Sequence, residues 1–137
     1  MKVLIDTNII IDVAAGRPGF YDSSNAVLNL CANGSIQGFV SSRVFCDMFY
    51  ILRKTFPVEE RKKQIRNIRG YLETVIISNT VIDAALNNNE ITDFEDAIQS
   101  ACAEAAGADY IVTRNTKDYA KSSVKAVSPE EFLKVIS

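Results

Sequence analysis

The sequence predicts an α/β fold: a three-layer α/β/α sandwich with a central, mostly parallel sheet of four to five strands. Short runs of apolar and β-branched residues alternate along the chain with longer segments of helical periodicity, and this alternation is typical of parallel sheets. Right-handed crossovers between the strands would place helices on both faces. The chain has 137 residues, 47% of them apolar, so we expect residues 1–137 to form a single domain with its own core.

The predicted strands are short, mainly apolar and β-branched runs, and Asp6 directly follows the first of them. They cover residues 2–5, 36–40, 74–77, 110–113 and 124–127. The predicted helices cover residues 8–15, 23–32, 43–54, 57–72, 80–87, 92–106 and a last segment from residue 130.

Several residues fit helix ends. Asp22 or Ser23 is predicted to cap the second helix, and Ser41-Ser42 the third. Gly107 is predicted to stop the helix over residues 92–106. In the helix over residues 57–72, the apolar positions expected to face the core are Val58, Ile65, Ile68 and Leu72.

The composition excludes several kinds of active site. The chain has no histidine, so a nucleophile activated by a Ser-His-Asp or Cys-His arrangement cannot be built. The three cysteines, Cys31, Cys46 and Cys102, lack the spacing of zinc ligands, and their odd number argues against a disulfide framework. An enzyme of this composition would rely on carboxylates and an oxygen-binding cation.

Neither secretion nor membrane insertion is predicted. Met1 leads directly into a strand, and no apolar run approaches the roughly 20 residues needed to span a bilayer. With cysteines suited to a reducing compartment, we expect a cytoplasmic protein that does not enter the membrane. The net charge of −2 lacks the basic footprint of many nucleic-acid binders. The basic residues of residues 57–72 are interpreted as a solvated helix face, with RNA contact as the less favoured alternative.

Acidic residues are placed where a parallel sheet would bring them together. Asp6 follows the first strand, Asp47 lies early in the helix after the second, and Asp96 lies in the first turns of the helix before the fourth. Open parallel sheets place their sites at the C-terminal ends of the strands. Asp6, Asp47 and Asp96 are therefore the predicted metal ligands and catalytic residues, because Mg²⁺ or Mn²⁺ would relieve the repulsion among clustered carboxylates.

Further polar residues near these positions are predicted to support the site or bind substrate. They are Thr7, Asn8, Asp93, Thr113, Arg114, Asn115 and Asp118.

Each acid also has an ordinary structural explanation. Asp6 can cap the helix that follows it. Thr92 and Glu95 form a capping box that would make Asp93 a first-turn residue compatible with the helix dipole. We prefer that explanation for Glu95 and leave Asp93 open. Asp47 can be a surface position on its helix.

Three segments of the chain resemble the motifs of PIN domains. Val3-Leu4-Ile5-Asp6-Thr7-Asn8 resembles the opening motif, and Asp93-Phe94-Glu95-Asp96-Ala97 resembles the acidic helix start of one bacterial branch. Ile111-Val112-Thr113-Arg114-Asn115, followed by Asp118-Tyr119, resembles the closing motif. Their order and spacing agree over nearly the whole chain.

The resemblance implies a Rossmann-like sandwich, dependence on Mg²⁺ or Mn²⁺, and cleavage of single-stranded or structured RNA. Many small bacterial members are toxins of toxin–antitoxin pairs and form homodimers. The partners implied are therefore an RNA substrate, an antitoxin protein and a second copy of the chain.

Position by position, Asp6 and Asp96 match the core metal ligands of the family. Asp47 falls where the family usually has glutamate, so its shorter side chain is expected to contact the metal only through water. Asn115 falls where some members have a fourth acid. Asp118 either supplies that charge or is only solvated.

Two other classes of protein remain as alternatives. One is a phosphotransfer or phosphatase domain with Asp6 as nucleophile. Haloacid-dehalogenase-like enzymes have a second aspartate two residues on, where this chain has Asn8. The other is a catalytically weak PIN-like module that binds RNA or a partner protein. Metal-dependent RNA cleavage by the purified protein would discriminate between these alternatives and the nuclease.

Overall fold

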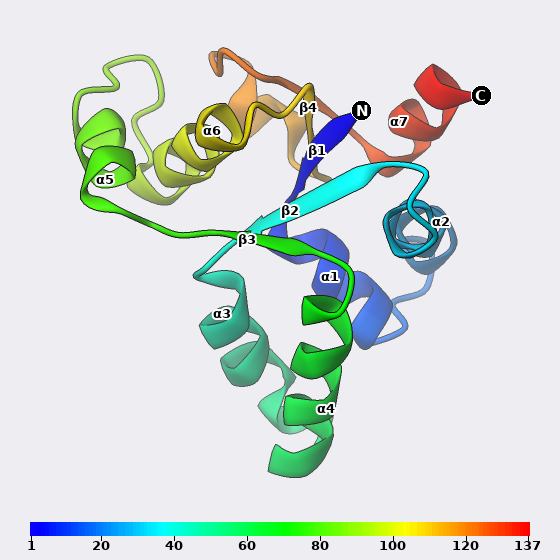
Figure 1. Ribbon diagram of the computed structural model, residues 1–137. Coiled ribbons are helices and arrows are strands. Elements are labelled where there is room, and N and C mark those ends of the chain that lie inside the picture. The colour runs from blue at the N-terminus through cyan, green and yellow to red at the C-terminus, as the bar shows by residue number, and fades with distance from the viewer.

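The computed structural model describes residues 1–137 and contains a five-stranded, fully parallel sheet between two layers of helices (Figure 1). The predicted three-layer α/β/α sandwich is confirmed. The strand order is β3-β2-β1-β4-β5. The strands are β1 (Lys2–Ile5), β2 (Gln37–Ser41), β3 (Glu73–Val75), β4 (Tyr110–Val112) and β5 (Lys125–Val127).

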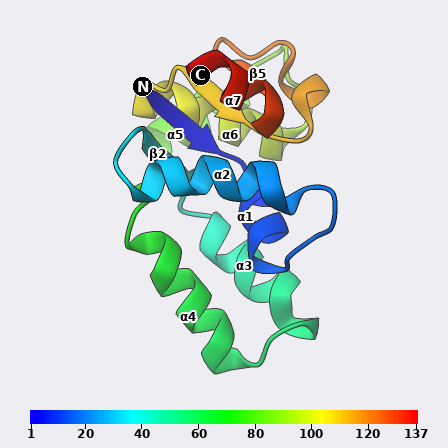
Figure 2. The same ribbon diagram turned by 90° about the vertical axis from the view of Figure 1, so that its right-hand side faces the viewer.

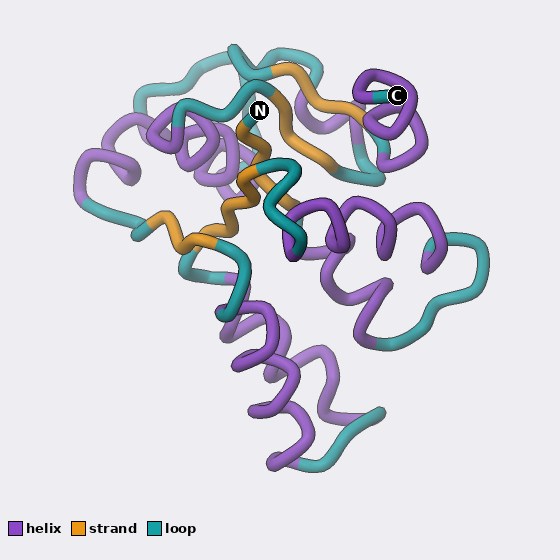
Figure 3. The backbone as a smooth tube through the Cα atoms, turned by 45° about the vertical axis from the view of Figure 1, so that its right-hand side comes forward, coloured by secondary structure: helices purple, strands orange, loops and turns teal.

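The α-helices form two layers of unequal size and one projecting pair. They are α1 (Thr7–Ala14), α2 (Tyr21–Ala32), α3 (Val44–Ile51), α4 (Val58–Arg69), α5 (Asn79–Leu86), α6 (Phe94–Ala106) and α7 (Pro129–Ile136), with short 3₁₀ helices at Leu52–Lys54 and Thr116–Tyr119. Helices α5 and α6 pack on one face of the sheet, while α1, α2 and α7 lie on the other (Figures 1 and 2). Helices α3 and α4 form a pair that extends away from the sheet (Figure 3). None of the helices combines the length and apolar character that a membrane crossing requires.

The central strand explains why the chain folds in layers. In β1, Val3 and Ile5 belong to the core under α1 and α2, while Leu4 belongs to the core under α5 and α6. All three side chains are at most 1% exposed. A strand buried on both faces reads as an uninterrupted apolar run, as this one does.

The order of the strands creates a crevice beside β1. From β1 the chain continues to β2 and β3 on one side of the sheet and later returns to place β4 and β5 on the other. Ile5 pairs with Val112 at the ends of β1 and β4, and the Asp6 N–H donates to the Val112 carbonyl over 3.0 Å. Such a switch point is where open α/β sheets bind ligands. It brings the segments after β1 and β4 side by side.

One helix end was predicted correctly, and one helix is shorter than predicted. Gly107 follows α6 with a left-handed φ of +66°, a conformation that a residue without Cβ adopts freely. Helix α4 ends at Arg69, and Leu72 is buried in the turn that follows. Val58 is 44% exposed, so its predicted place in the core is wrong. It lies in the first turn of the projecting helix, beyond the reach of the sheet.

Two predicted helix caps are also wrong. Helix α2 begins at Tyr21, so Asp22 and Ser23 lie inside its first turn and neither caps it. Before α3, the Ser42 hydroxyl oxygen instead accepts a hydrogen bond from the Ile77 N–H over 3.2 Å. That long-range contact uses the side chain that local sequence would assign to capping.

Candidate functional site

A cavity of about 420 Å³ opens at the C-terminal edge of the sheet, beside the ends of β1 and β2. Residues from the starts of α1, α3 and α6 line it, together with the segment after β4. Its charged lining residues are Asp6, Arg17, Arg43, Asp47, Glu95 and Asp96. The three aspartates predicted as metal ligands therefore line one cavity, and their role as ligands stays a prediction.

Asp6 is held by donors on both of its carboxylate oxygens. Oδ1 accepts hydrogen bonds from the Thr7 N–H at 2.7 Å and from Gln99 Nε2 at 3.0 Å. Oδ2 accepts from Thr113 Oγ1 at 2.7 Å and from Asn8 Nδ2 at 3.4 Å. Asp6 also occupies the N-cap position of α1. Asp6 as a residue is 9% exposed, and its carboxylate is fixed in direction by the end of β4 and by α6.

Asp96 is the acid whose protonation the surroundings alter most clearly. Burial, followed by the nearby charges of Asp93, Asp118 and Asp6, raises its pKa from the ordinary 3.8 to about 6, against a hydrogen bond from Tyr119 that lowers it. Burial, with these acids nearby, also raises the pKa of the Tyr119 phenol, so it stays neutral and can donate to Asp96. The cavity thus holds negative charge that the protein compensates incompletely.

Asp47 reaches the cavity but is paired with an arginine. Arg43 Nε lies 3.4 Å from Asp47 Oδ2, and Arg43 Nη2 lies 3.0 Å from Glu95 Oε1. One guanidinium therefore joins α3 to α6 across the cavity. The hydrogen bond to Glu95 is the main reason why the pKa of Arg43 is raised.

The capping box predicted for α6 is wrong. The N-cap is Asp93, whose Oδ1 accepts from the Asp96 N–H over 3.0 Å. Because the helix begins one residue later than the box requires, Thr92 lies outside it. Glu95 is thereby free to pair with Arg43, and the preference for a purely capping role was mistaken. Asp93 does not line the cavity, although its charge contributes to the raised pKa of Asp96.

The segment after β4 supports Asp6 from the other side. Thr113 is fully buried, donates to Asp6 Oδ2 and accepts from the Asn115 N–H over 3.0 Å. Asn115 lines the cavity. Asp118 is exposed and lies outside the lining, but its negative charge contributes to the raised pKa of Asp96. Thr7 and Asn8 are also in the lining.

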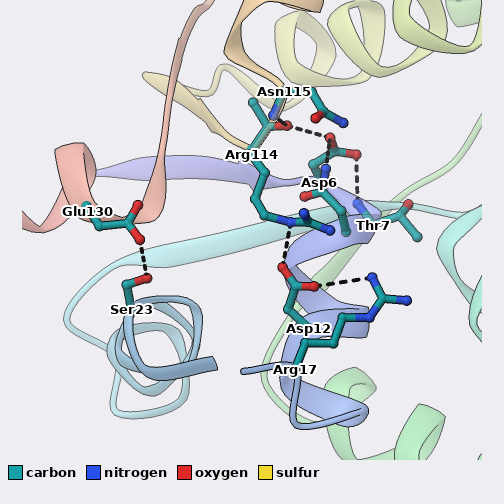
Figure 4. A network of polar contacts seen from close by, with 10 residues as sticks. Asp6, Thr7, Asp12, Arg17, Ser23, Arg114, Asn115 and Glu130 are labelled. Carbon is teal, nitrogen blue, oxygen red and sulfur yellow. Dashed lines mark hydrogen bonds and ion pairs between the residues drawn. The ribbon is translucent and has the colours of Figure 1, made fainter. Parts of the chain in front are cut away.

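Arg114 turns away from the cavity toward a buried acid that sequence reasoning missed. Figure 4 shows Asp12 of α1 between Arg114 and Arg17. Asp12 is 0% exposed; its Oδ2 lies 2.7 Å from Arg114 Nε as an ion pair, and its Oδ1 lies 3.3 Å from Arg17 Nη1. The guanidinium of Arg114 also lies over the ring of Phe20, 4.2 Å from its centroid.

Some missed lining residues carried a weak signal in the sequence. Gln99 follows Asp96 by three positions and Arg43 precedes Asp47 by four, and such pairs share a helix face. Arg17 carried no such signal, because it lies in the loop between α1 and α2. Lining residues missed by sequence reasoning are Ile11, Arg17, Ser41, Arg43, Tyr50, Ile51, Glu95, Ile98, Gln99 and Tyr119.

The donor set fits a hydrated Mg²⁺ or Mn²⁺ better than a fully enclosed metal. No three His, Cys, Asp or Glu side chains converge closely enough to surround an ion. Mg²⁺, however, keeps several waters and is commonly bound by one or two carboxylates, and Asp6 and Asp96 offer these. The amide oxygens Oδ1 of Asn8 and Oε1 of Gln99 are buried beside Asp6 without a hydrogen-bond partner. Coordinated waters would supply donors to such oxygens.

Comparisons with known proteins agree with this geometry. A family model described as PIN domain matches residues 2–117. VapBC2 from Rickettsia felis, solved bound to a promoter DNA fragment, has a TM-score of 0.73 at 20% identity, over 93% of this chain and 98% of that chain. A toxin–antitoxin complex from Klebsiella pneumoniae has a TM-score of 0.70 at 24% identity, over 93% and 97%. VapC20 from Mycobacterium tuberculosis, described as a toxin cleaving the sarcin–ricin loop, has a TM-score of 0.66 at 10% identity, over 87% and 94%. At these identities the likeness is one of fold. No curated protein matches the chain in sequence.

Proposed function

Because this chain belongs to the PIN domain family, we propose that it is a Mg²⁺- or Mn²⁺-dependent endoribonuclease that hydrolyses phosphodiester bonds of RNA. The observation that carries the proposal is the meeting of Asp6 and Asp96 in one cavity, where burial and neighbouring acids raise the pKa of Asp96 to about 6. A protein gains nothing in stability from such an arrangement. A divalent cation would relieve it.

Asp6 and Asp96 are the proposed metal ligands, and Asp47 contributes through a water molecule. A divalent cation bound there supplies activation of a water nucleophile and neutralisation of phosphate charge. Thr113 and Gln99 orient the Asp6 carboxylate by donating to opposite oxygens. Tyr119 lines the same cavity and lies close enough to Asp96 to lower its pKa. Oriented ligands of this kind raise metal affinity.

The remaining supporting residues have separate roles in the proposal. Thr7 and Asn8 complete the donors around Asp6, and Asp93 holds the start of α6. Asn115 lies at the cavity for contact with substrate, while Asp118 adds negative charge near Asp96.

The chain is further proposed to be the toxin of a toxin–antitoxin pair, acting in the cytoplasm and forming a homodimer. Support comes from the shared fold with the Klebsiella pneumoniae toxin–antitoxin complex and with VapC20, over more than nine-tenths of each of those chains. Because the aligned regions cover most of this chain and most of those chains, they favour a single PIN domain over residues 1–137.

A PIN-like module with weak catalysis, binding RNA or a partner protein, is the second candidate. Arg43 favours it, because its guanidinium pairs with both Asp47 and Glu95 and leaves these acids less available to a cation. Asp6 as a phosphotransfer nucleophile is less suited, since both of its oxygens already accept hydrogen bonds.

The test is single-turnover cleavage of short RNAs by the purified full-length protein in Mg²⁺, in Mn²⁺ and in EDTA. The nuclease proposal expects cleavage in a divalent metal only, and loss of cleavage in a folded Asp96→Asn variant. RNA binding without cleavage in either metal favours the weak module. Cleavage at the wild-type rate by Asp96→Asn contradicts the metal assignment.

A further inference from the structure

The charges that line the cavity are unevenly compensated. Four carboxylates and two guanidinium groups face it. An RNA phosphodiester carries a negative charge and would be repelled by the acids unless a cation in the lining remained available for it. The contacts of Arg17 and Arg43 show which of the two can bind a phosphate.

Arg43 is not available. Its guanidinium contacts Asp47 and Glu95, one carboxylate on each side. These two carboxylates and one guanidinium together carry a net negative charge, which repels phosphate.

Arg17 belongs to a group with the opposite balance. Asp12 is fully buried and shares its single negative charge between Arg17 and Arg114. Arg114 takes the shorter contact, is 28% exposed in its side chain and is covered by Phe20. Arg17 keeps the longer contact, and its side chain is 42% exposed and lines the cavity. The positive charge left over is therefore presented by Arg17.

The position of Arg17 is fixed from two directions. Its backbone N–H donates to the Asp12 carbonyl over 2.9 Å, just after Gly16 has turned the chain with a φ of +62°. Its side chain uses one nitrogen for the contact with Asp12. A guanidinium has five N–H donors in a fork that fits two phosphate oxygens, so most of them remain free.

We propose that Arg17 binds a phosphate of the RNA at the mouth of the cavity and that Asp12 is the residue that positions it. The proposal rests on the proposed function, because it takes RNA as the ligand. Asp12 touches no substrate in this arrangement. It acts by holding Arg17 and Arg114 (Figure 4). Arg114 directly follows Thr113 in the segment after β4.

The first test measures binding without cleavage. A fluorescein-labelled single-stranded 12-nucleotide RNA is titrated with the full chain in EDTA, by anisotropy, over a series of salt concentrations. Arg17→Ala should weaken binding by roughly 10- to 100-fold. It should also make the plot of log affinity against log salt less steep, by about 0.7 in slope, the value for one lost phosphate contact to single-stranded nucleic acid. Arg17→Lys should keep the slope but not regain full affinity, since an ammonium lacks the fork.

Arg69→Ala is the matched control. Arg69 is exposed, forms no ion pair, and ends α4 just before β3 begins, at the edge of the sheet opposite the cavity. Its loss should leave the affinity within about twofold and the slope unchanged. Equal effects of Arg17→Ala and Arg69→Ala, or none from Arg17→Ala, overturn the proposal.

Asp12→Asn separates positioning from simple charge. If Asp12 only offset positive charge, its removal would strengthen RNA binding. If it positions Arg17, removal weakens binding and Arg17→Ala then adds little. Should Asp12→Asn fail to fold, as judged by circular dichroism, the Arg17→Lys comparison decides. A parallel cleavage assay in Mn²⁺ keeps the two ideas apart: an inactive wild type contradicts the nuclease, while active protein with unchanged binding in Arg17→Ala contradicts only the role of Arg17.

Discussion

Replacing Asp96 with asparagine should stabilise the metal-free protein in a way that depends on pH. Burial and the charges of Asp93, Asp118 and Asp6 raise the pKa of Asp96 to about 6. The folded state therefore holds this proton more tightly than the unfolded state does. The stability gained by binding this proton is fully present below the pKa of Asp96 in the unfolded chain, near 3.9. It is lost as the pH rises through about 6, the pKa in the folded state. Asparagine does not ionise, so the Asp96→Asn variant does not lose stability over this pH range.

The magnitude follows from the shift. The difference between 3.8 and about 6 is about 2.2 pH units, which at about 1.36 kcal/mol per unit gives a ceiling of about 3 kcal/mol. Asp96 is partly exposed, and screening by water reduces the gain to about 1–2 kcal/mol. For a chain of 137 residues, that corresponds to a melting temperature about 3–7 °C higher.

The assay is thermal unfolding in EDTA at pH 4, 6 and 7.5. The difference between Asp96→Asn and wild type should be small at pH 4 and full at pH 7.5. Asp83→Asn, an exposed aspartate on α5 outside the cavity, is the control and should show no such dependence. Added Mn²⁺ should stabilise the wild type more than the variant. A variant less stable than wild type at pH 7.5, or a difference independent of pH, refutes the reasoning.

Three further predictions concern the support of the site and its chemistry. Thr113→Val removes the 2.7 Å donor to buried Asp6 at nearly constant volume and should cost about 1–3 kcal/mol in urea unfolding; an unchanged midpoint and slope would show that this hydrogen bond contributes nothing. Asp12→Asn leaves two guanidinium groups without their buried counter-ion and should cost about 3–5 kcal/mol, so a loss below about 1 kcal/mol would contradict the account of that network. With no histidine in the chain, the single-turnover cleavage rate should rise with pH through the neutral and mildly alkaline range, and Mn²⁺ should support activity at lower pH than Mg²⁺; identical profiles in the two metals, or activity in EDTA, would rule this out.

The layers of the fold could be predicted because their signals are local. The central strand β1 holds the apolar run Val3-Leu4-Ile5, which Asp6 ends, and Gly107 stops α6 where a left-handed residue is needed. The errors occurred where a distant partner competes with a local preference. Ser42 could cap α3 but instead accepts from Ile77 of the segment after β3. A contact between residues 35 positions apart cannot be predicted from the residues next to Ser42.

The candidate site divides in the same way. Asp6, Asp47 and Asp96 could be assigned to one cavity because parallel strands end at a common edge. The Asp12 network could not be predicted, since Arg114 lies 102 positions further along the chain. Its existence depends on β4 pairing beside β1, which is a property of the whole sheet.

The acids of the cavity also show why capping and function are not exclusive explanations. In a parallel sheet, each strand leads from the C-terminal edge into a helix N-terminus, where a carboxylate satisfies free N–H groups. Asp6 Oδ1 accepts from the Thr7 N–H in this way, and Asp93 Oδ1 accepts from the Asp96 N–H at the start of α6. Capping therefore gathers acids at the rim where ligands bind. Asp96 is different, because it caps nothing, and its surroundings oppose its charge. A residue that is predicted to destabilise the metal-free fold fits the metal-binding role proposed for Asp96.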